Sequence, residues 1–173
     1  MAKIARQRRV SREVPAAVFP SPDHDHAQCS TEAMTLAESI CAGRGERLTP
    51  IRRGVLAALL ASHRPLGAYE LMDRLAHDGA RPAPITVYRA LDFLMANGLV
   101  HRIESRNAFV ACVHNHADGE FVVFFICERC GAVGESSAAG VVDALRTASR
   151  EAKFAPKTPV IEITGTCAHC RDG

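Results

Sequence analysis

The spacing of apolar residues changes twice along the chain and divides it into three stretches. Residues 1–30 mix arginines, prolines and a DHDH run without a sustained period, which predicts a mobile tail. From residue 31 the pattern becomes helical. Thr35 and Glu38 form a capping box at the start of a first helix, which is expected to end at Gly43.

Three more helices and two short strands are predicted next. The second helix opens at Thr49 with a proline in its first position, the third covers residues 68–79, and the fourth runs from Thr86 to the stop at Asn97-Gly98. Residues 99–112 then alternate as two strands around a turn. This order predicts a winged helix–turn–helix. The positions expected to face its core are Leu36, Ile40, Cys41, Ile51, Val55, Leu56, Leu59, Leu60, Leu71, Met72, Leu75, Val87, Ala90, Leu91, Leu94 and Met95.

The last third predicts a smaller unit of mixed helix and strand. Strands are expected at 121–126, 132–136 and 160–164, with a helix near 141–152. The first of these strands is apolar on both faces, so a helix on one side and a second subunit on the other would cover it. The predicted fold class is α+β, with three parts: a tail (1–30), a winged-helix domain (31–110) and a small α/β domain (111–173).

Composition narrows the class of protein. With 47% hydrophobic and 23% charged residues among 173, the chain is not fully disordered. No apolar run reaches the roughly 20 residues of a membrane span, and no secretory signal is evident, so a cytoplasmic location and no membrane partner are expected. In that reducing compartment the seven cysteines favour metal ligands, catalytic thiols or core positions over disulfides. A net charge of +2 permits nucleic-acid binding by a local patch without demonstrating it.

Two CxxC pairs carry the strongest chemical signal. Cys127, Cys130, Cys167 and Cys170 can present four thiolates to one tetrahedral ion. A thioredoxin-like redox site would need one CxxC opening a helix, whereas here each pair follows a predicted strand. We therefore expect a closed structural zinc site, which contributes to folding and not to catalysis.

A second group of potential ligands lies near the join between the two predicted domains. It combines sulfur, nitrogen and oxygen donors, which would suit a mixed metal site, although each residue alone has an ordinary structural interpretation. Its members are His101, Cys112, His114, His116, Glu120 and Glu135. Four others, Cys29, Cys41, His24 and His26, are expected to have no role in function.

The start of the fourth helix carries residues suited to contact DNA. Thr86, Tyr88 and Arg89 lie on its outward side, where a recognition helix enters the major groove. Tyr69 and the wing residues Arg102 and Arg106 are expected to contact the flanking backbone or minor groove. For Arg52 and Arg53 a phosphate contact and ordinary solvation are equally good interpretations.

Together the segments LTPIRRGVL, AYELMDRL, PITVYRALDFLMANGLVHRIES, FVAC, FICERCGAVGE and CAHC resemble the ferric uptake regulator family, and within it the zinc uptake regulator branch, over residues 34–170. The resemblance implies a homodimeric repressor of zinc-uptake genes that binds palindromic promoter DNA. It makes residues 31–110 the winged-helix DNA-binding domain and residues 111–173 the dimerisation and metal-binding domain, with one structural zinc ion on the four cysteines and one regulatory zinc ion between the domains. It implies regulatory ligands at His101, Cys112 and Glu135, and DNA contacts at Tyr69 and Arg89.

The fourth regulatory ligand departs from the family pattern. Counting back without gaps from Cys127 places a family histidine on Glu120, whereas the nearest histidines are His116 and His114. We favour His116, whose nitrogen suits zinc, and keep Glu120, which suits the register. The tail is longer than the family pattern needs, and Met34 is an alternative start.

The presence of a cysteine among the regulatory ligands favours zinc. Iron- and peroxide-responsive members of the family would use nitrogen and oxygen ligands, and they remain the alternative. Two other classes stay open: a thiol oxidoreductase using Cys127 and Cys130, and a zinc-ribbon module that binds only protein. The favoured hypothesis is a regulator that is not an enzyme and has no small-molecule substrate.

Overall fold

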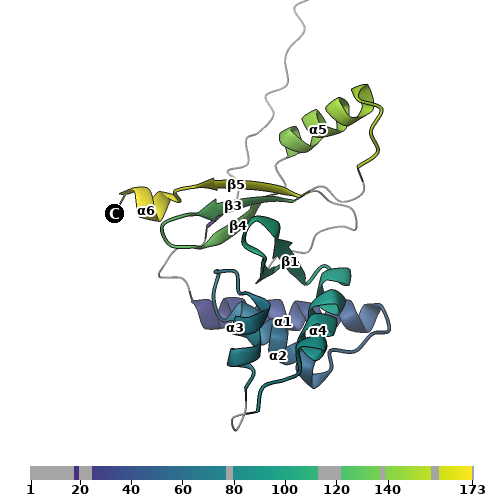
Figure 1. Ribbon diagram of the computed structural model, residues 1–173, viewed down its shortest axis with the longest axis vertical. Coiled ribbons are helices and arrows are strands. Elements are labelled where there is room, and N and C mark those ends of the chain that lie inside the picture. Colours follow the sequence, from purple (N-terminus) through teal and green to yellow (C-terminus); the bar gives the residue numbers. More distant parts are fainter. Residues whose placement is uncertain are drawn as a thin grey trace, which may run out of the picture.

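The computed structural model describes residues 18–19, 25–76, 80–112, 122–136, 139–156 and 160–172. Figure 1 shows a helical part at one end of the molecule, a three-stranded sheet above it, and a short hairpin between them. Among the described residues no helix has both the length and the apolar character to cross a membrane.

Four helices build the first part: α1 (His26–Gly43), α2 (Pro50–Leu60), α3 (Ala68–Arg74) and α4 (Pro84–Ala96). Most of the predicted stripe is buried between them, and Val55, Leu59, Leu71, Val87, Leu91 and Leu94 have no exposed surface. The others of that stripe that stay half-buried are Leu36, Ile40, Ile51, Leu75 and Met95. Cys41 is 1% exposed inside this core, as expected of a cysteine that acts as a small hydrophobic residue.

The helix boundaries correct the sequence prediction in three places. α1 begins at His26 because the side chain of Asp25 accepts the N–H of Gln28, so the predicted start at Thr35 is wrong and residues 26–30 are not a tail. α4 begins at Pro84, two residues earlier than predicted, with proline in the first turn. α3 ends at Arg74, although the prediction ran to Gly79, and residues 77–79 lie outside the described part.

The predicted wing is a hairpin of β1 (Val100–Ile103) and β2 (Ala108–Ala111), joined by the 3-10 turn η1 (Glu104–Arg106). Asn107 closes the turn in the left-handed region, with φ 46°. The two faces of the hairpin pack on different neighbours. Val100, Phe109 and Ala111 belong to the helical core, whereas Ile103 and Val110 belong to the core beneath the sheet.

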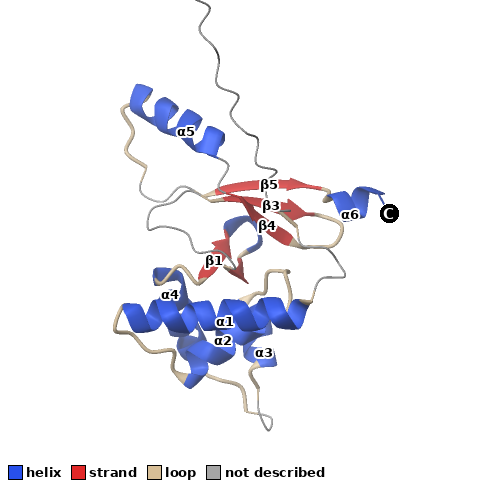
Figure 2. Ribbon diagram, turned by 180° about the vertical axis from the view of Figure 1, so that it is seen from behind, coloured by secondary structure: helices blue, strands red, loops and turns tan. Residues whose placement is uncertain are grey.

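The sheet has the order β4-β3-β5, with β3 (Val123–Cys127) in the centre. β4 (Val133–Ser136) pairs with it antiparallel and β5 (Ile161–Gly165) pairs parallel. Side chains of β3, among them Phe124 and Ile126, pack toward the hairpin. α5 (Ala139–Glu151) stands away from the sheet (Figures 1 and 2) and leaves Val141 and Leu145 exposed. The sheet thus has the wing on one side, and not the helix that was expected to cover it.

Two close backbone approaches involve β4. The N–H of Val133 donates to the carbonyl of His63, in the loop after α2, at 3.0 Å. At Gly134 an added Cβ would collide with the carbonyl oxygen of Val18, which is a backbone atom and cannot rotate away. Segments that precede the wing by many residues therefore lie directly on β4.

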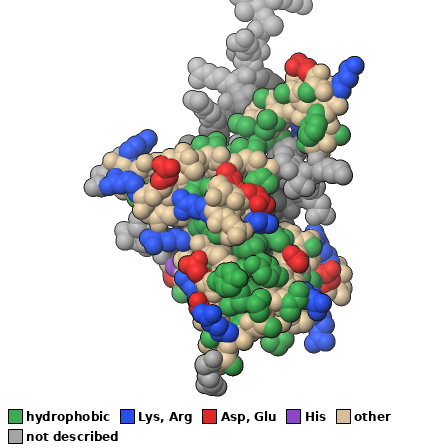
Figure 3. Space-filling view, in the orientation of Figure 1, with side chains coloured by type: hydrophobic (Ala, Val, Ile, Leu, Met, Phe, Trp, Pro, Cys, Tyr) green, Lys and Arg blue, Asp and Glu red, His purple; other side chains and the backbone are tan. Residues whose placement is uncertain are grey.

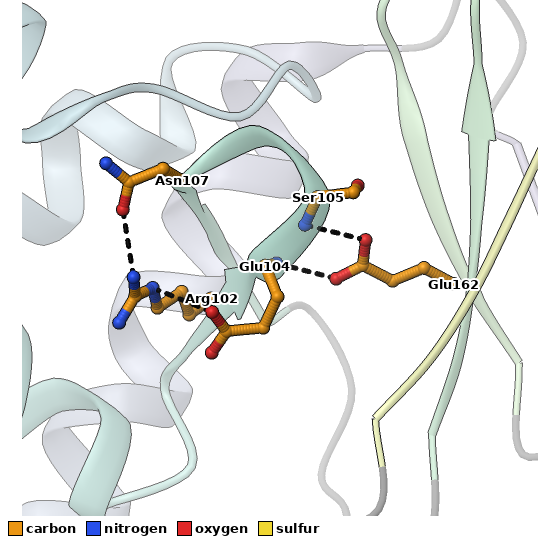
Figure 4. Close-up of polar contacts among 5 residues, drawn as sticks. All are labelled: Arg102, Glu104, Ser105, Asn107 and Glu162. Carbon is orange, nitrogen blue, oxygen red and sulfur yellow. Dashed lines mark hydrogen bonds and ion pairs between the residues drawn. The ribbon is translucent and has the colours of Figure 1, made fainter.

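The tip of the wing is tied to the sheet by one carboxylate. Glu162 of β5 accepts the N–H groups of Glu104 at 2.6 Å and of Ser105 at 3.1 Å (Figure 4). These are the first N–H groups of the 3-10 turn, where an anion is favoured. The same turn is braced by Arg102, which pairs with Glu104 at 3.3 Å and donates to Asn107 at 2.9 Å.

Replacement of Glu162 by alanine should loosen the tip of the wing. Both N–H groups would lose a charged acceptor, so their hydrogen exchange should accelerate by about tenfold. Amide exchange measured by NMR tests this, with Glu151→Ala on the exposed end of α5 as the control. Equal exchange at Glu104 and Ser105 in all three proteins would show that the carboxylate does not hold the turn.

Candidate metal centres and nucleic-acid interface

The four cysteines predicted to act together do lie together. Cys127 ends β3, and Cys130 closes the turn that follows. Cys167 directly precedes α6 (Ala168–Asp172), and Cys170 lies within it. The four sulfur atoms are all within 4.8 Å of one another. The Sγ atoms of Cys130 and Cys167 are 3.9 Å apart. Sulfur ligands at the zinc distance of about 2.3 Å in a tetrahedron lie about 3.8 Å apart, so this group fits such an ion.

The local backbone prepares this cluster. Gly131 follows Cys130 with φ 77°, which only glycine adopts without strain, and its N–H donates to the carbonyl of Cys127 at 2.9 Å, which closes the turn between the two cysteines. The N–H of Cys167 donates to the Cys127 sulfur at 3.4 Å. The short α6 was not predicted. Because it begins directly after Cys167, the second CxxC opens a helix. A redox pair is still disfavoured because all four thiols converge on one point.

The electrostatics of the cluster suit a cation. Backbone N–H groups, that of Cys130 first, lower the pKa of the Cys127 thiol to about 6. Its neighbour Cys167, followed by burial, raises the pKa of Cys170 to about 12. One thiolate thus forms readily and discourages the next from forming. A bound divalent ion removes that repulsion and allows further thiols to ionise.

The second cluster joins the wing to the sheet. His101 of β1, Cys112 after β2 and Glu135 of β4 offer ligand atoms that lie within 4.8 Å of one another. Nε2 of His101 is 3.3 Å from one Glu135 oxygen, and the Cys112 sulfur is 3.7 Å from the other. A close group of one sulfur, one nitrogen and one carboxylate ligand is a donor set that fits zinc.

Strand register explains how two of these residues meet. His101 pairs with Val110, and Cys112 donates its N–H to Leu99, so His101 and Cys112 lie diagonally on one face of the hairpin. That face is the one turned toward β3 and β4. The side chain of Glu135 is only 6% exposed, so water competes little for its oxygens. The candidates for a fourth ligand, His114, His116 and Glu120, lie outside the described residues.

A third cluster was missed by the sequence analysis. His26 and Cys29, which were expected to have no function, lie with His63 so that their ligand atoms are all within 4.8 Å. The only sequence signal was the spacing of three between His26 and Cys29, which places both on one side of a helix. His63 stands in another segment and has no motif around it.

Three of the residues predicted to contact DNA are exposed on α3 and α4. Tyr69 on α3 is 71% exposed and Tyr88 on α4 is 42% exposed, and Arg89 beside it is also exposed. Thr86 is half-buried. Ile85, which the sequence analysis did not select, is 59% exposed at the start of α4 and adds an apolar group suited to a thymine methyl. Figure 3 shows hydrophobic side chains gathered on the helical part, with arginines beside them.

The remaining arginines are held within the fold to different degrees. Arg102 is braced by Glu104 and Asn107 but stays exposed, whereas Arg106 extends toward Gly131 in the cysteine turn, within 3.9 Å of where a Cβ would be. Arg52 stacks on Phe93, 3.4 Å from the ring centroid, and Arg53 pairs with Glu38. The geometry favours Arg102 over Arg106 as a DNA contact, and Arg52 and Arg53 have partners inside the protein.

Comparison with known proteins decides the family. The model of the ferric uptake regulator family matches residues 43–164, which is more than half of the chain. The chain belongs to the ferric uptake regulator family. It is 43% identical to the zinc uptake regulation protein of Escherichia coli K12 over 139 residues, which cover 80% of this chain and 81% of that protein. It is 30% identical to the peroxide-responsive repressor PerR of Staphylococcus aureus over 142 residues, 79% and 92% of the two chains.

Among solved structures, a zinc uptake regulator in complex with zinc and DNA is 41% identical to this family member. It superposes with a TM-score of 0.75 over 83% of this chain and 95% of that one. A likeness of this extent supports the architecture predicted from the sequence.

Removal of one thiol from the four-cysteine cluster should release its metal and loosen the C-terminal half. For Cys127→Ser we expect loss of one metal ion per chain and a fall in the melting temperature of roughly 10 °C or more, because a structural metal supplies folding free energy. Metal analysis and thermal unfolding measure both. Cys41→Ala, which alters a core cysteine, should keep its metal. A Cys127→Ser protein with normal metal content and melting temperature would contradict the assignment.

Proposed function

We propose that the protein is a zinc-responsive transcriptional repressor that binds palindromic promoter DNA as a homodimer and controls zinc-uptake genes. The observation that carries the proposal is the cluster of His101, Cys112 and Glu135, because two members belong to the wing and one to the sheet. Such a regulator acts where the DNA is, which agrees with the cytoplasmic location expected from the sequence.

Zinc is favoured over iron by the ligands themselves. A thiolate with an imidazole and a carboxylate suits zinc. Nε2 of His101 and one oxygen of Glu135 are 3.3 Å apart, which is the separation expected of two ligands on one zinc ion. The greater identity to a zinc uptake regulation protein than to a peroxide-responsive repressor supports the same choice. The four cysteines would hold a second, structural zinc, which leaves no open position for catalysis and opposes a thiol oxidoreductase.

The coupling of metal to DNA follows from where the ligands stand. His101 lies on β1, whose neighbouring residue Val100 is buried in the helical core that carries α4. Glu135 lies on β4, in the sheet that the dimer would share. When bound, zinc would hold imidazole, thiolate and carboxylate together and so fix the recognition helix relative to the sheet. Two recognition helices must stand about 34 Å apart to read a palindrome, and a loose joint meets that spacing only part of the time.

The homodimer is supported by apolar surface that the single chain leaves uncovered. Val141 and Leu145 of α5 are exposed by 44% and 40%, and Ile163 of β5 by 44%. Phe154 and Val160, in the connection between α5 and β5, are exposed by 67% and 45%. Exposed apolar residues gathered on one helix and the strand that follows favour a second copy of the chain as their cover.

A zinc titration followed by DNA binding tests the proposal. The protein, with its four-cysteine site filled, is mixed with a fluorescent AT-rich palindromic duplex, and anisotropy is followed as zinc is added. Affinity should rise with zinc and should not rise for a scrambled duplex of equal length and charge. By linkage, the palindromic duplex should raise the affinity of the protein for zinc by the same factor by which zinc raises its affinity for the duplex. Zinc-independent DNA binding, or none at any zinc concentration, would overturn the proposal.

Cys112→Ser should give a folded protein that does not respond to zinc. Serine is a far poorer ligand than a thiolate, so the joint between wing and sheet stays loose while the four-cysteine site keeps its ion. Affinity for the palindrome should remain at the zinc-free level across the titration. Cys41→Ala is the matched control. A normal zinc response in Cys112→Ser would place the switch on other residues.

Arg89 and Arg102 should affect DNA binding in different ways. Arg89→Ala should reduce discrimination between the palindrome and random DNA by about 1 to 3 kcal/mol, since an arginine at this position can grip a guanine with two hydrogen bonds. Arg102→Ala should weaken binding to the palindrome and to random DNA alike, because a wing arginine contacts phosphates. Competition binding on the two duplexes separates these effects, and parallel losses in both variants would refute base reading by Arg89.

A further inference from the structure

The third cluster lies apart from the two metal centres described above. It brings together the first residue of α1, a cysteine one turn later, and His63 in the loop after α2, with all three half-buried. The rings of His26 and His63 meet edge to face, with centroids 4.8 Å apart and an interplanar angle of 63°. Two segments separated by more than thirty residues thus deliver two imidazoles and a thiol to one point.

We propose that His26, Cys29 and His63 form a third metal site, which binds a borderline divalent ion such as Zn²⁺ through two nitrogens and one sulfur. No carboxylate belongs to this donor set, so the hard ions Mg²⁺ and Ca²⁺, which take oxygen ligands, are excluded as the bound metal. In a tetrahedral site these atoms would lie about 3.3 to 3.8 Å apart. The ligand atoms now lie within 4.8 Å of one another, and small side-chain rotations would bring them to the tetrahedral separation.

The local structure holds two of the three ligands in place without a metal. Asp25 caps the first turn of α1 by accepting the N–H of Gln28 at 3.0 Å, and its carbonyl accepts the N–H of Cys29 at 3.1 Å. This turn fixes His26 and Cys29 on one side of the helix. Preorganisation of this kind reduces the ordering entropy that an ion must overcome when it binds.

His63 is held from the other side. Its carbonyl accepts the N–H of Val133 on β4, and the Ser62 hydroxyl bonds with the backbone of Arg64 to shape the turn around it. An ion at this site would therefore join the start of α1 to a loop anchored on the sheet. Three protein ligands leave a fourth tetrahedral position for water, so this ion should exchange more readily than one held by four cysteines.

A reactive cysteine is the alternative use of this cluster. Burial, and then the charge of Glu32, raises the pKa of the Cys29 thiol, so the thiol stays protonated at neutral pH and is a poor nucleophile. An ion bound to His26 and His63 would have to displace this proton to gain the sulfur as a ligand.

Cobalt binding tests the site directly. The full-length chain with Cys112→Ser, and with zinc in its four-cysteine cluster, receives one equivalent of Co²⁺, and thiolate-to-cobalt absorption is recorded. The same measurement is made on Cys112→Ser with Cys29→Ser. The two proteins differ only at Cys29, so the comparison is valid whether or not Cys112 belongs to the regulatory site.

The expected result is a thiolate-to-cobalt band in the first protein that the second lacks. Equilibrium dialysis with Zn²⁺ should then give one more ion per chain in the first. His63→Gln should lower the affinity of this ion by roughly 100-fold or more, because even residues that only orient a ligand cost about 10- to 100-fold. Cys41→Ala should change nothing. Equal absorption and equal zinc content with and without Cys29, or full affinity in His63→Gln, would overturn the proposal.

Discussion

The hairpin of β1 and β2 is the constraint on which the rest of the structure depends, because it is packed on both faces. One face contributes Phe109 and Ala111 to the core of the helices, and the other contributes Ile103 and Val110 to the core beneath the sheet. A strand pair that is buried on both sides cannot slip by one residue without turning its apolar side chains the wrong way for both cores. Its register is therefore doubly specified, and so is the position of His101 within it.

That double packing places the candidate metal ligands between the wing and the sheet. His101 and Cys112 share the sheet-facing side of the hairpin, where Glu135 meets them, while Glu162 holds the tip of the same hairpin from the opposite edge of the sheet. The hairpin is thus held by apolar packing, by one carboxylate at its tip and by the cluster at its base. Of these three, the cluster is the one whose side chains could also hold a metal ion.

Sequence reasoning succeeded where the signal was local. Thr49 and the proline after it marked the start of α2, Asn97-Gly98 marked the end of α4, and the two CxxC spacings brought four thiols together. It failed where the signal came from elsewhere in the fold. The composition of the first thirty residues suggested a tail, yet Asp25 caps a helix that packs on α2. His63 acquires its neighbours only through the packing of α1 beside α2, which no spacing in the sequence records.

Gly134 shows how little free space surrounds β4 next to the candidate cluster. Its backbone does not need the left-handed region, so glycine is present for space, and the space is taken by the carbonyl of Val18. A single methyl group at this position would push the early segment off β4 or push β4 away from it. Because Glu135 is the next residue of the same strand, such a displacement would also move a member of the candidate metal cluster. A side chain at position 134 would therefore disturb the candidate cluster of His101, Cys112 and Glu135 from outside it, with all three of those side chains unchanged.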